Sequence, residues 1–140
     1  MEQATAHLCR IEDEKLMENT SNTILLINDE PVLCRSLALM LRRAGYKVTT
    51  AADEEEALEH LLTGKYQLVC LDLKWEDRNG NGVSSIREIC QRCPGTPVLL
   101  LSDSPQEDAL LQKVEDLHYE SLLKPLDPSH FIARVKAILA

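Results

Sequence analysis

Residues 23–31 read TILLINDEP, and this stretch decides the fold because an apolar run leads directly into polar residues. The run ILLI at 24–27 is typical of a strand that is buried on both faces of a sheet. Asn28, Asp29 and Glu30 follow at its carboxyl end, and the proline after them suits the first position of a helix. The stretch therefore predicts a buried strand that leads through a polar loop into a helix.

The order of strand and helix then repeats along the chain. Apolar residues with helical spacing follow the first strand until Gly45, which ends that helix. Asp53 and Glu56 form a capping box for the next helix, and Asp127 followed by Pro128 begins the last one. The sequence predicts strands at 23–27, 46–51, 66–73, 98–102 and 120–124, and helices at 31–44, 53–62, 82–93, 105–117 and from 128 onward.

Strands that alternate with helices imply right-handed parallel crossovers, and hence an α/β fold with a five-stranded, doubly wound parallel sheet. In such sheets the ligand crevice lies beyond the carboxyl ends of the strands. The polar residues at those ends should therefore be considered together. They are Asn28, Asp29 and Glu30 after the first strand, Asp72 in the third, Ser102 at the end of the fourth and Lys124 at the end of the fifth.

Length and charge restrict the class of protein. The 140 residues fit one domain, which we place at 23–140, preceded by an N-terminal extension at 1–22 that forms a tail or an accessory helix. A formal net charge of −8 repels phosphate backbones, so direct binding of nucleic acid is not expected. The apolar runs are too short to span a membrane and no secretory signal is evident, so we expect a cytoplasmic protein without membrane attachment.

The five cysteines do not form an even, closely spaced framework of disulfides. Cys90 and Cys93 form a CxxC motif, but a structural zinc site needs four ligands and no second pair follows at finger spacing. We therefore favour packing over a metal or redox role for this pair. The remaining cysteines are Cys9, Cys34 and Cys70.

Taken together, these stretches resemble the receiver domain of two-component response regulators. TILLINDEP resembles its acidic first loop, YQLVCLDL with Asn79 and Gly80 its phosphoacceptor strand, TPVLLLS its hydroxyl strand and LLKP its lysine strand. The spacing also fits, with 43 residues from Asp29 to Asp72 and 52 from Asp72 to Lys124. The resemblance covers about residues 23–140 and implies a flavodoxin-like strand order of 2-1-3-4-5.

The resemblance implies that Asp72 accepts a phosphoryl group from a histidine kinase or a phosphotransfer protein. Lys124 would pair with Asp72 at rest and with a phosphoryl oxygen after transfer, as a flexible ammonium can. Ser102 would donate a hydrogen bond to the new phosphoryl group. The chain would thus be a switch and not an enzyme, acting on an effector domain or a protein partner, and a homodimer is compatible with the family.

The resemblance also implies a Mg²⁺ cofactor. A carboxylate attacks phosphorus only when its charge and that of the donor are neutralised, which a divalent cation does. Asp29, Asp72 and the backbone carbonyl of Lys74 would supply oxygen ligands, and Asn28 would bond to metal-bound water. Because the family has a second acid where this chain has Asn28, we expect weaker binding of Mg²⁺ here.

A second departure follows the hydroxyl strand, where the family prefers a small side chain and this chain has Asp103. A carboxylate there would crowd and repel an incoming phosphodonor. Lys74 is near in the sequence, and we interpret it as a candidate partner for Asp103. These departures keep a second hypothesis open, a degenerate pseudo-receiver that acts as an interaction module without phosphorylation.

Two other classes fit the sequence less well. A haloacid-dehalogenase-like phosphatase also uses an aspartate nucleophile, but it carries a second aspartate two residues later, where this chain has Lys74. A flavin or dinucleotide carrier would need a GxGxxG motif after the first strand, and none is present there.

Overall fold

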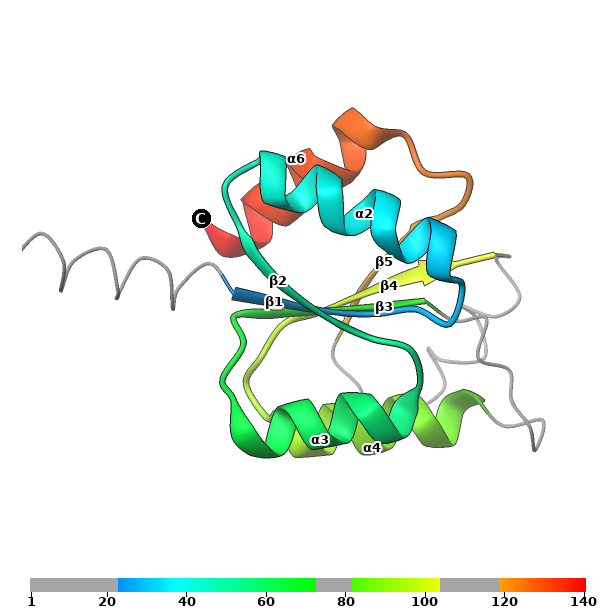
Figure 1. Cartoon of the computed structure of the whole chain (residues 1–140), viewed down its shortest axis with the longest axis vertical. Coiled ribbons are helices and arrows are strands. Elements are labelled where there is room, and N and C mark those ends of the chain that lie inside the picture. The colour runs from blue at the N-terminus through cyan, green and yellow to red at the C-terminus, as the bar shows by residue number, and fades with distance from the viewer. Residues whose placement is uncertain (1–22, 73–81, 104–118) are drawn as a thin grey trace, which may run out of the picture.

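The computed structural model describes residues 23–72, 82–103 and 119–140 (Figure 1). Its five strands form one parallel sheet in the order β2-β1-β3-β4-β5, which confirms the predicted order and the doubly wound topology. The strands are β1 (Thr23–Ile27), β2 (Lys47–Ala51), β3 (Leu68–Asp72), β4 (Val98–Ser102) and β5 (Glu120–Leu123).

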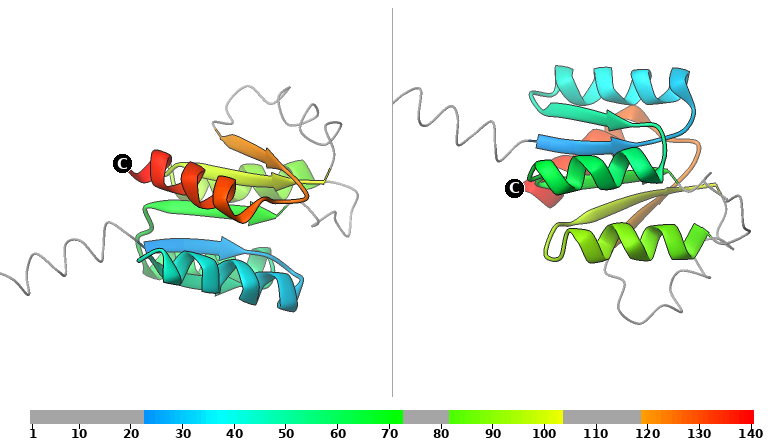
Figure 2. Two further views of the ribbon diagram at one scale, coloured as in Figure 1. Left: turned by 90° about the horizontal axis from the view of Figure 1, so that it is seen from above. Right: turned by 60° about the horizontal axis from the view of Figure 1, so that its bottom comes forward.

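Helices cover both faces of this sheet, as Figures 1 and 2 show. The described helices are α2 (Pro31–Arg43), α3 (Glu54–Thr63), α4 (Gly82–Arg92) and α6 (Pro128–Leu139). The first and last of these pack on one face, and the other two pack on the opposite face. The helix predicted at 105–117 and the extension at 1–22 lie outside the described residues. Among the helices that are described, none has the length and apolar character that a membrane crossing requires.

The central strands are buried as the apolar runs predicted. Every residue of β3 and β4 is buried, and so are the four residues ILLI of β1. Alternate side chains of these strands enter two separate apolar clusters, one on each face of the sheet. A strand that contacts helices on both faces has no solvated side, which explains why its sequence is continuously apolar.

The predicted start signals of two helices are confirmed. The side chain of Asp53 accepts a hydrogen bond from the backbone N–H of Glu56 at 2.8 Å. The Glu56 carboxylate accepts in return from the N–H of Ala52 at 2.8 Å, one residue earlier than in a standard capping box. Asp127 caps α6 by accepting from the N–H of Ser129 at 3.2 Å. These caps satisfy N–H groups that the first turn of a helix leaves without partners.

The described cysteines pack as thiols. Cys34 and Cys70 are buried in the core, and no disulfide joins any of the four cysteines that the structure describes. Burial raises the pKa of Cys90 to about 11 and also raises that of Cys93, whose thiol contacts the carbonyl oxygen of Ile89 at 3.1 Å. High pKa values disfavour thiolate chemistry, so the CxxC pair is explained by packing at the end of α4.

Candidate functional site

The carboxyl ends of the strands meet at one edge of the sheet. In the register of the sheet, Asp72 lies opposite Leu101, and Ser102 lies opposite Leu123. The backbone N–H of Lys124 donates to the carbonyl oxygen of Ser102 at 2.8 Å, which extends the pairing of β4 and β5 by one residue. The hydroxyl and lysine strands therefore end side by side, next to the end of the strand that carries Asp72.

Lys124 and Asp72 form an ion pair across this edge. The Lys124 Nζ atom donates to both carboxylate oxygens of Asp72, each at 2.7 Å. The Asp72 side chain is 0% exposed and that of Lys124 is 14% exposed. Because β4 lies between the two strands and neighbouring strands are about 4.8 Å apart, only a long side chain reaches across. Lysine at this position is thus explained by distance as well as by charge.

Charge and burial act in opposite directions on the Lys124 ammonium. Burial lowers its pKa, but the hydrogen bond and charge of Asp72, with the charge of Asp103, outweigh that effect. The pKa of Lys124 is therefore raised above its ordinary value. The ammonium stays protonated at neutral pH and is available as a permanent positive charge beside Asp72.

Asp103 also contacts this ammonium. One of its carboxylate oxygens lies 3.5 Å from the Lys124 Nζ atom, and its side chain is 37% exposed. The interpretation that Lys74 pairs with Asp103 is not needed to explain the position of Asp103, and Lys74 lies outside the described residues. Sequence reasoning recognised Asp103 as unusual but did not anticipate its contact with Lys124. The available signal was that residues directly after two adjacent parallel strands lie close together.

Asn28 and Asp29 follow β1 at the same edge. Ile27 lies opposite Leu71, so Asn28 follows at the level of Asp72. Asn28 is buried, and its side-chain oxygen accepts a hydrogen bond from the backbone N–H of Glu30 at 2.8 Å. Its Nδ2 atom is buried without a hydrogen-bond partner among the described residues. Asp29, the next residue after Asn28, is exposed.

The donor set at this edge fits a hard divalent cation. The carboxylates of Asp29 and Asp72 and the side-chain oxygen of Asn28 are the kind of ligand that Mg²⁺ prefers. Within residues 23–72, 82–103 and 119–140, no group of three or more histidine, cysteine, aspartate and glutamate side chains is placed to hold a metal. Besides the carboxylates of Asp29 and Asp72, amide, backbone or water oxygens would have to complete the octahedral shell that Mg²⁺ prefers.

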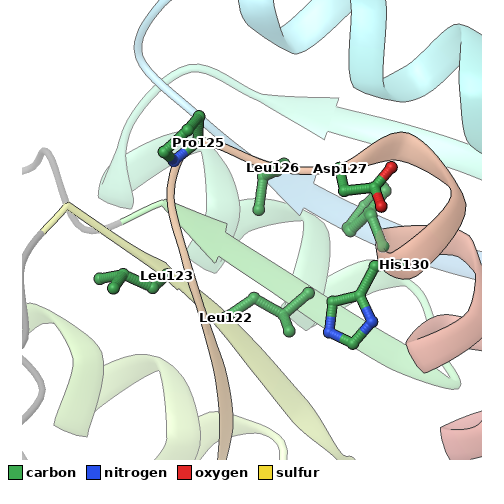
Figure 3. A pocket seen from close by; sticks show the side chains of 7 residues that line it. Leu122, Leu123, Pro125, Leu126, Asp127 and His130 are labelled. Carbon is green, nitrogen blue, oxygen red and sulfur yellow. The ribbon is translucent and has the colours of Figure 1, made fainter.

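A separate hollow of about 430 Å³ lies where β5 leads into α6 (Figure 3). Neither Asp72 nor Asp103, the two acids that contact Lys124, lines this hollow. Phe131 lines this hollow and is itself 0% exposed. The lining residues are Leu122, Leu123, Pro125, Leu126, Asp127, His130 and Phe131.

Comparison with known proteins gives consistent results. The family model described as the response regulator receiver domain matches residues 24–136. The transcriptional regulatory protein ResD of Bacillus subtilis is 31% identical over 124 residues, which are 88% of this chain and 50% of ResD. The protein SrrA of Staphylococcus aureus is 30% identical over 120 residues, 85% of this chain and 48% of SrrA. The chain thus spans about half the length of these relatives.

Two solved structures are similar in both fold and sequence. The response regulator TrrA from Thermotoga maritima, in complex with Mg²⁺ and BeF, is 26% identical with a TM-score of 0.71, covering 84% of this chain and 98% of TrrA. A response regulator from Burkholderia pseudomallei with a phosphorylated aspartic acid and a calcium ion is 28% identical with a TM-score of 0.68, covering 83% of this chain and 71% of that one. This chain belongs to the family of response regulator receiver domains.

Proposed function

We propose that the chain is a phosphoacceptor domain of a two-component system, in which Asp72 accepts a phosphoryl group with the help of Mg²⁺. The observation that carries this proposal is the contact of Lys124 with both oxygens of Asp72 at the carboxyl end of a central strand. A buried carboxylate held by an ammonium is charge-balanced at rest and has a ready cation for the phosphoryl group.

In the proposed reaction, one carboxylate oxygen of Asp72 forms a new bond to the phosphorus atom. The bond from phosphorus to the donor breaks, and the donor leaves with the electron pair. Lys124 must release one Asp72 oxygen for this step, and its ammonium then binds a phosphoryl oxygen. Ser102, at the end of the adjacent strand, donates its hydroxyl hydrogen to the same phosphoryl group.

We further propose that Asp29 and Asp72 hold Mg²⁺ directly, together with the backbone carbonyl of Lys74, and that Asn28 contributes through water. When bound, Mg²⁺ neutralises charge on the carboxylates and on the phosphoryl oxygens. The contact of the Asn28 oxygen with the N–H of Glu30 leaves it only one lone pair for water. Support comes from the metal ions in the structures of TrrA and of the Burkholderia regulator.

The first test uses beryllofluoride with Mg²⁺, which imitates a phosphoryl group on a carboxylate. We expect shifts of the backbone amide resonances of Ser102 and Lys124 in a nitrogen-15 NMR spectrum, because both residues would contact the new anion. Asp72→Asn is the matched control and should show no such shifts. Unchanged spectra of the wild type would contradict the proposal and favour the pseudo-receiver hypothesis.

A second prediction concerns the affinity for Mg²⁺. Asn28→Asp should strengthen binding by about tenfold, because it adds a carboxylate at the level of Asp72. It should also lower the free energy of unfolding without Mg²⁺, since two buried carboxylates would then repel each other. Calorimetric titration with Mg²⁺ measures the first effect, and urea unfolding measures the second. Asn28→Ala is the control, because it removes the side-chain oxygen without adding charge. Equal affinities of Asn28→Asp and the wild type for Mg²⁺ would contradict this account of the site.

The wider setting is also a proposal. We propose that a histidine kinase or a phosphotransfer protein supplies the phosphoryl group, and that phosphorylation alters the contact with an effector domain or a protein partner. ResD and SrrA are transcriptional regulators about twice as long as the matched region, which supports an effector elsewhere in a longer regulator. We also propose that the protein is cytoplasmic and forms a homodimer. Its chain would consist of an N-terminal extension at 1–22 and a receiver domain at 23–140.

A further inference from the structure

The Lys124 ammonium is shared between two carboxylates. It contacts both oxygens of Asp72 at 2.7 Å and one oxygen of Asp103 at 3.5 Å. The two carboxylates differ in their surroundings, because Asp72 is 0% exposed whereas Asp103 is 37% exposed. Asp103 is therefore the outer, more solvent-accessible of the two carboxylates that contact the ammonium.

The position of Asp103 is set by the backbone. The N–H of Lys124 donates to the carbonyl oxygen of Ser102 at 2.8 Å, and Asp103 is the next residue after Ser102. This hydrogen bond keeps the two chain segments adjacent, so the carboxylate needs no rearrangement to reach the ammonium.

We propose that Asp103 competes with an incoming phosphodonor for the Lys124 ammonium and thereby slows the acceptance of phosphoryl groups by Asp72. The inference rests on the proposed function, because it concerns the rate of that reaction. The Lys124 ammonium must leave Asp103 before it can bind a phosphoryl oxygen. The Asp103 carboxylate also repels an anionic donor as the donor approaches. Asp103 is thus a positioning residue that acts through Lys124, and it disfavours small anionic donors.

The reaction that tests the proposal is transfer from acetyl phosphate. A carboxylate oxygen of Asp72 bonds to phosphorus, the bond between phosphorus and the acetyl oxygen breaks, and acetate leaves with the electron pair. No oxidant is needed and no net proton transfer is required. The rate is followed by intact mass spectrometry of the full chain with Mg²⁺, at fixed concentrations of protein and donor.

Asp103→Asn keeps the size of the side chain and removes its charge. We expect it to raise the rate constant of labelling roughly threefold to tenfold, the range for removing one partly exposed charge near a reacting anion. Glu59→Gln is the matched control, because it removes one exposed carboxylate of α3 outside the strand-end site. It gives the same net charge and should leave the rate unchanged.

The dependence on salt separates repulsion by charge from a structural effect. Added sodium chloride screens the carboxylate, so the rate of the wild type should rise relative to that of Asp103→Asn as ionic strength increases. A variant that merely loosened the fold would show a lower melting temperature and no such convergence. Asp103→Ala removes bulk as well as charge, and it should match Asp103→Asn if charge is the cause.

The outcomes are distinct. Labelling of the wild type at the same rate as Asp103→Asn would overturn the inference and leave the proposed function intact. Faster labelling of Asp103→Ala without faster labelling of Asp103→Asn would also overturn the inference. Crowding by the side chain, and not competition for Lys124, would then be responsible. Labelling of neither chain, together with no response to beryllofluoride, would overturn the proposed function and this inference with it. Labelling of Asp103→Asn with little labelling of the wild type would support both.

Discussion

Replacing Asp72 with asparagine is expected to abolish phosphoryl labelling, with a loss of roughly a hundredfold or more because an amide is not a nucleophile towards phosphorus. The carboxylate of Asp72 is the acid that Lys124 contacts through both oxygens. Intact mass spectrometry after incubation with acetyl phosphate and Mg²⁺ measures the result. Two other acids, Asp29 and Asp103, flank the site and remain in the variant, so the experiment also tests which carboxylate reacts.

The variant should remain folded, which makes its loss of labelling interpretable. Lys124 is partly exposed and keeps its contact with Asp103, so Asp72→Asn does not leave the ammonium buried without a negative charge. We expect a melting temperature at or above that of the wild type, since one buried charge is removed. Labelling of Asp72→Asn at the rate of the wild type would assign the reaction to another residue.

Replacing Lys124 with methionine is expected to lower the free energy of unfolding by about 2–4 kcal/mol at neutral pH, because the buried Asp72 carboxylate loses its ammonium. Methionine keeps an apolar stem of similar length, so the change mainly removes charge. Urea unfolding at pH 7 measures the effect. Asp72→Asn in the same chain should recover most of the loss, since the buried charge that Lys124 neutralises would then be absent.

The contribution of Lys124 to the free energy of unfolding should depend on pH. The pKa of Lys124 is raised in the folded chain, so its contribution to stability is complete below the ordinary lysine pKa of about 10.4. That contribution is lost as the pH rises through the higher pKa of the folded state. The difference in stability between wild type and Lys124→Met should therefore be constant from pH 7 to about 10 and shrink above that range. A difference that did not shrink above that range would contradict the sign of this shift.

Secondary structure was predictable where local chemistry and burial agree. The run at 24–27 became a strand with both faces buried, and the caps at Asp53 and Asp127 began helices at the expected residues. The doubly wound parallel sheet followed from the alternation of strands and helices, whereas the strand order, which the structure confirms, came from the family resemblance. Ends of elements differed by a residue or two, as with β3, which the sequence begins at 66 and the structure begins at Leu68.

Parts of the site were harder to predict. The pairing of Lys124 with Asp72 was expected from the resemblance, and the structure brings the two together at 2.7 Å. The contact of Lys124 with Asp103 was not expected, since nothing in the spacing of 21 residues between them specifies a contact. The orientation of the Asn28 side chain was not predicted either, because it depends on a hydrogen bond that its oxygen accepts from the backbone N–H of Glu30.

The sequence by itself determined the strands, the helices and the edge at which the polar residues gather, because periodicity, helix caps and the ends of apolar runs are local properties. Only the tertiary structure decided how charge is distributed at that edge. One ammonium lies between an inner carboxylate at Asp72 and an outer one at Asp103. Such sharing depends on distances between side chains from different strands, and those distances are fixed only when the strands pack against each other.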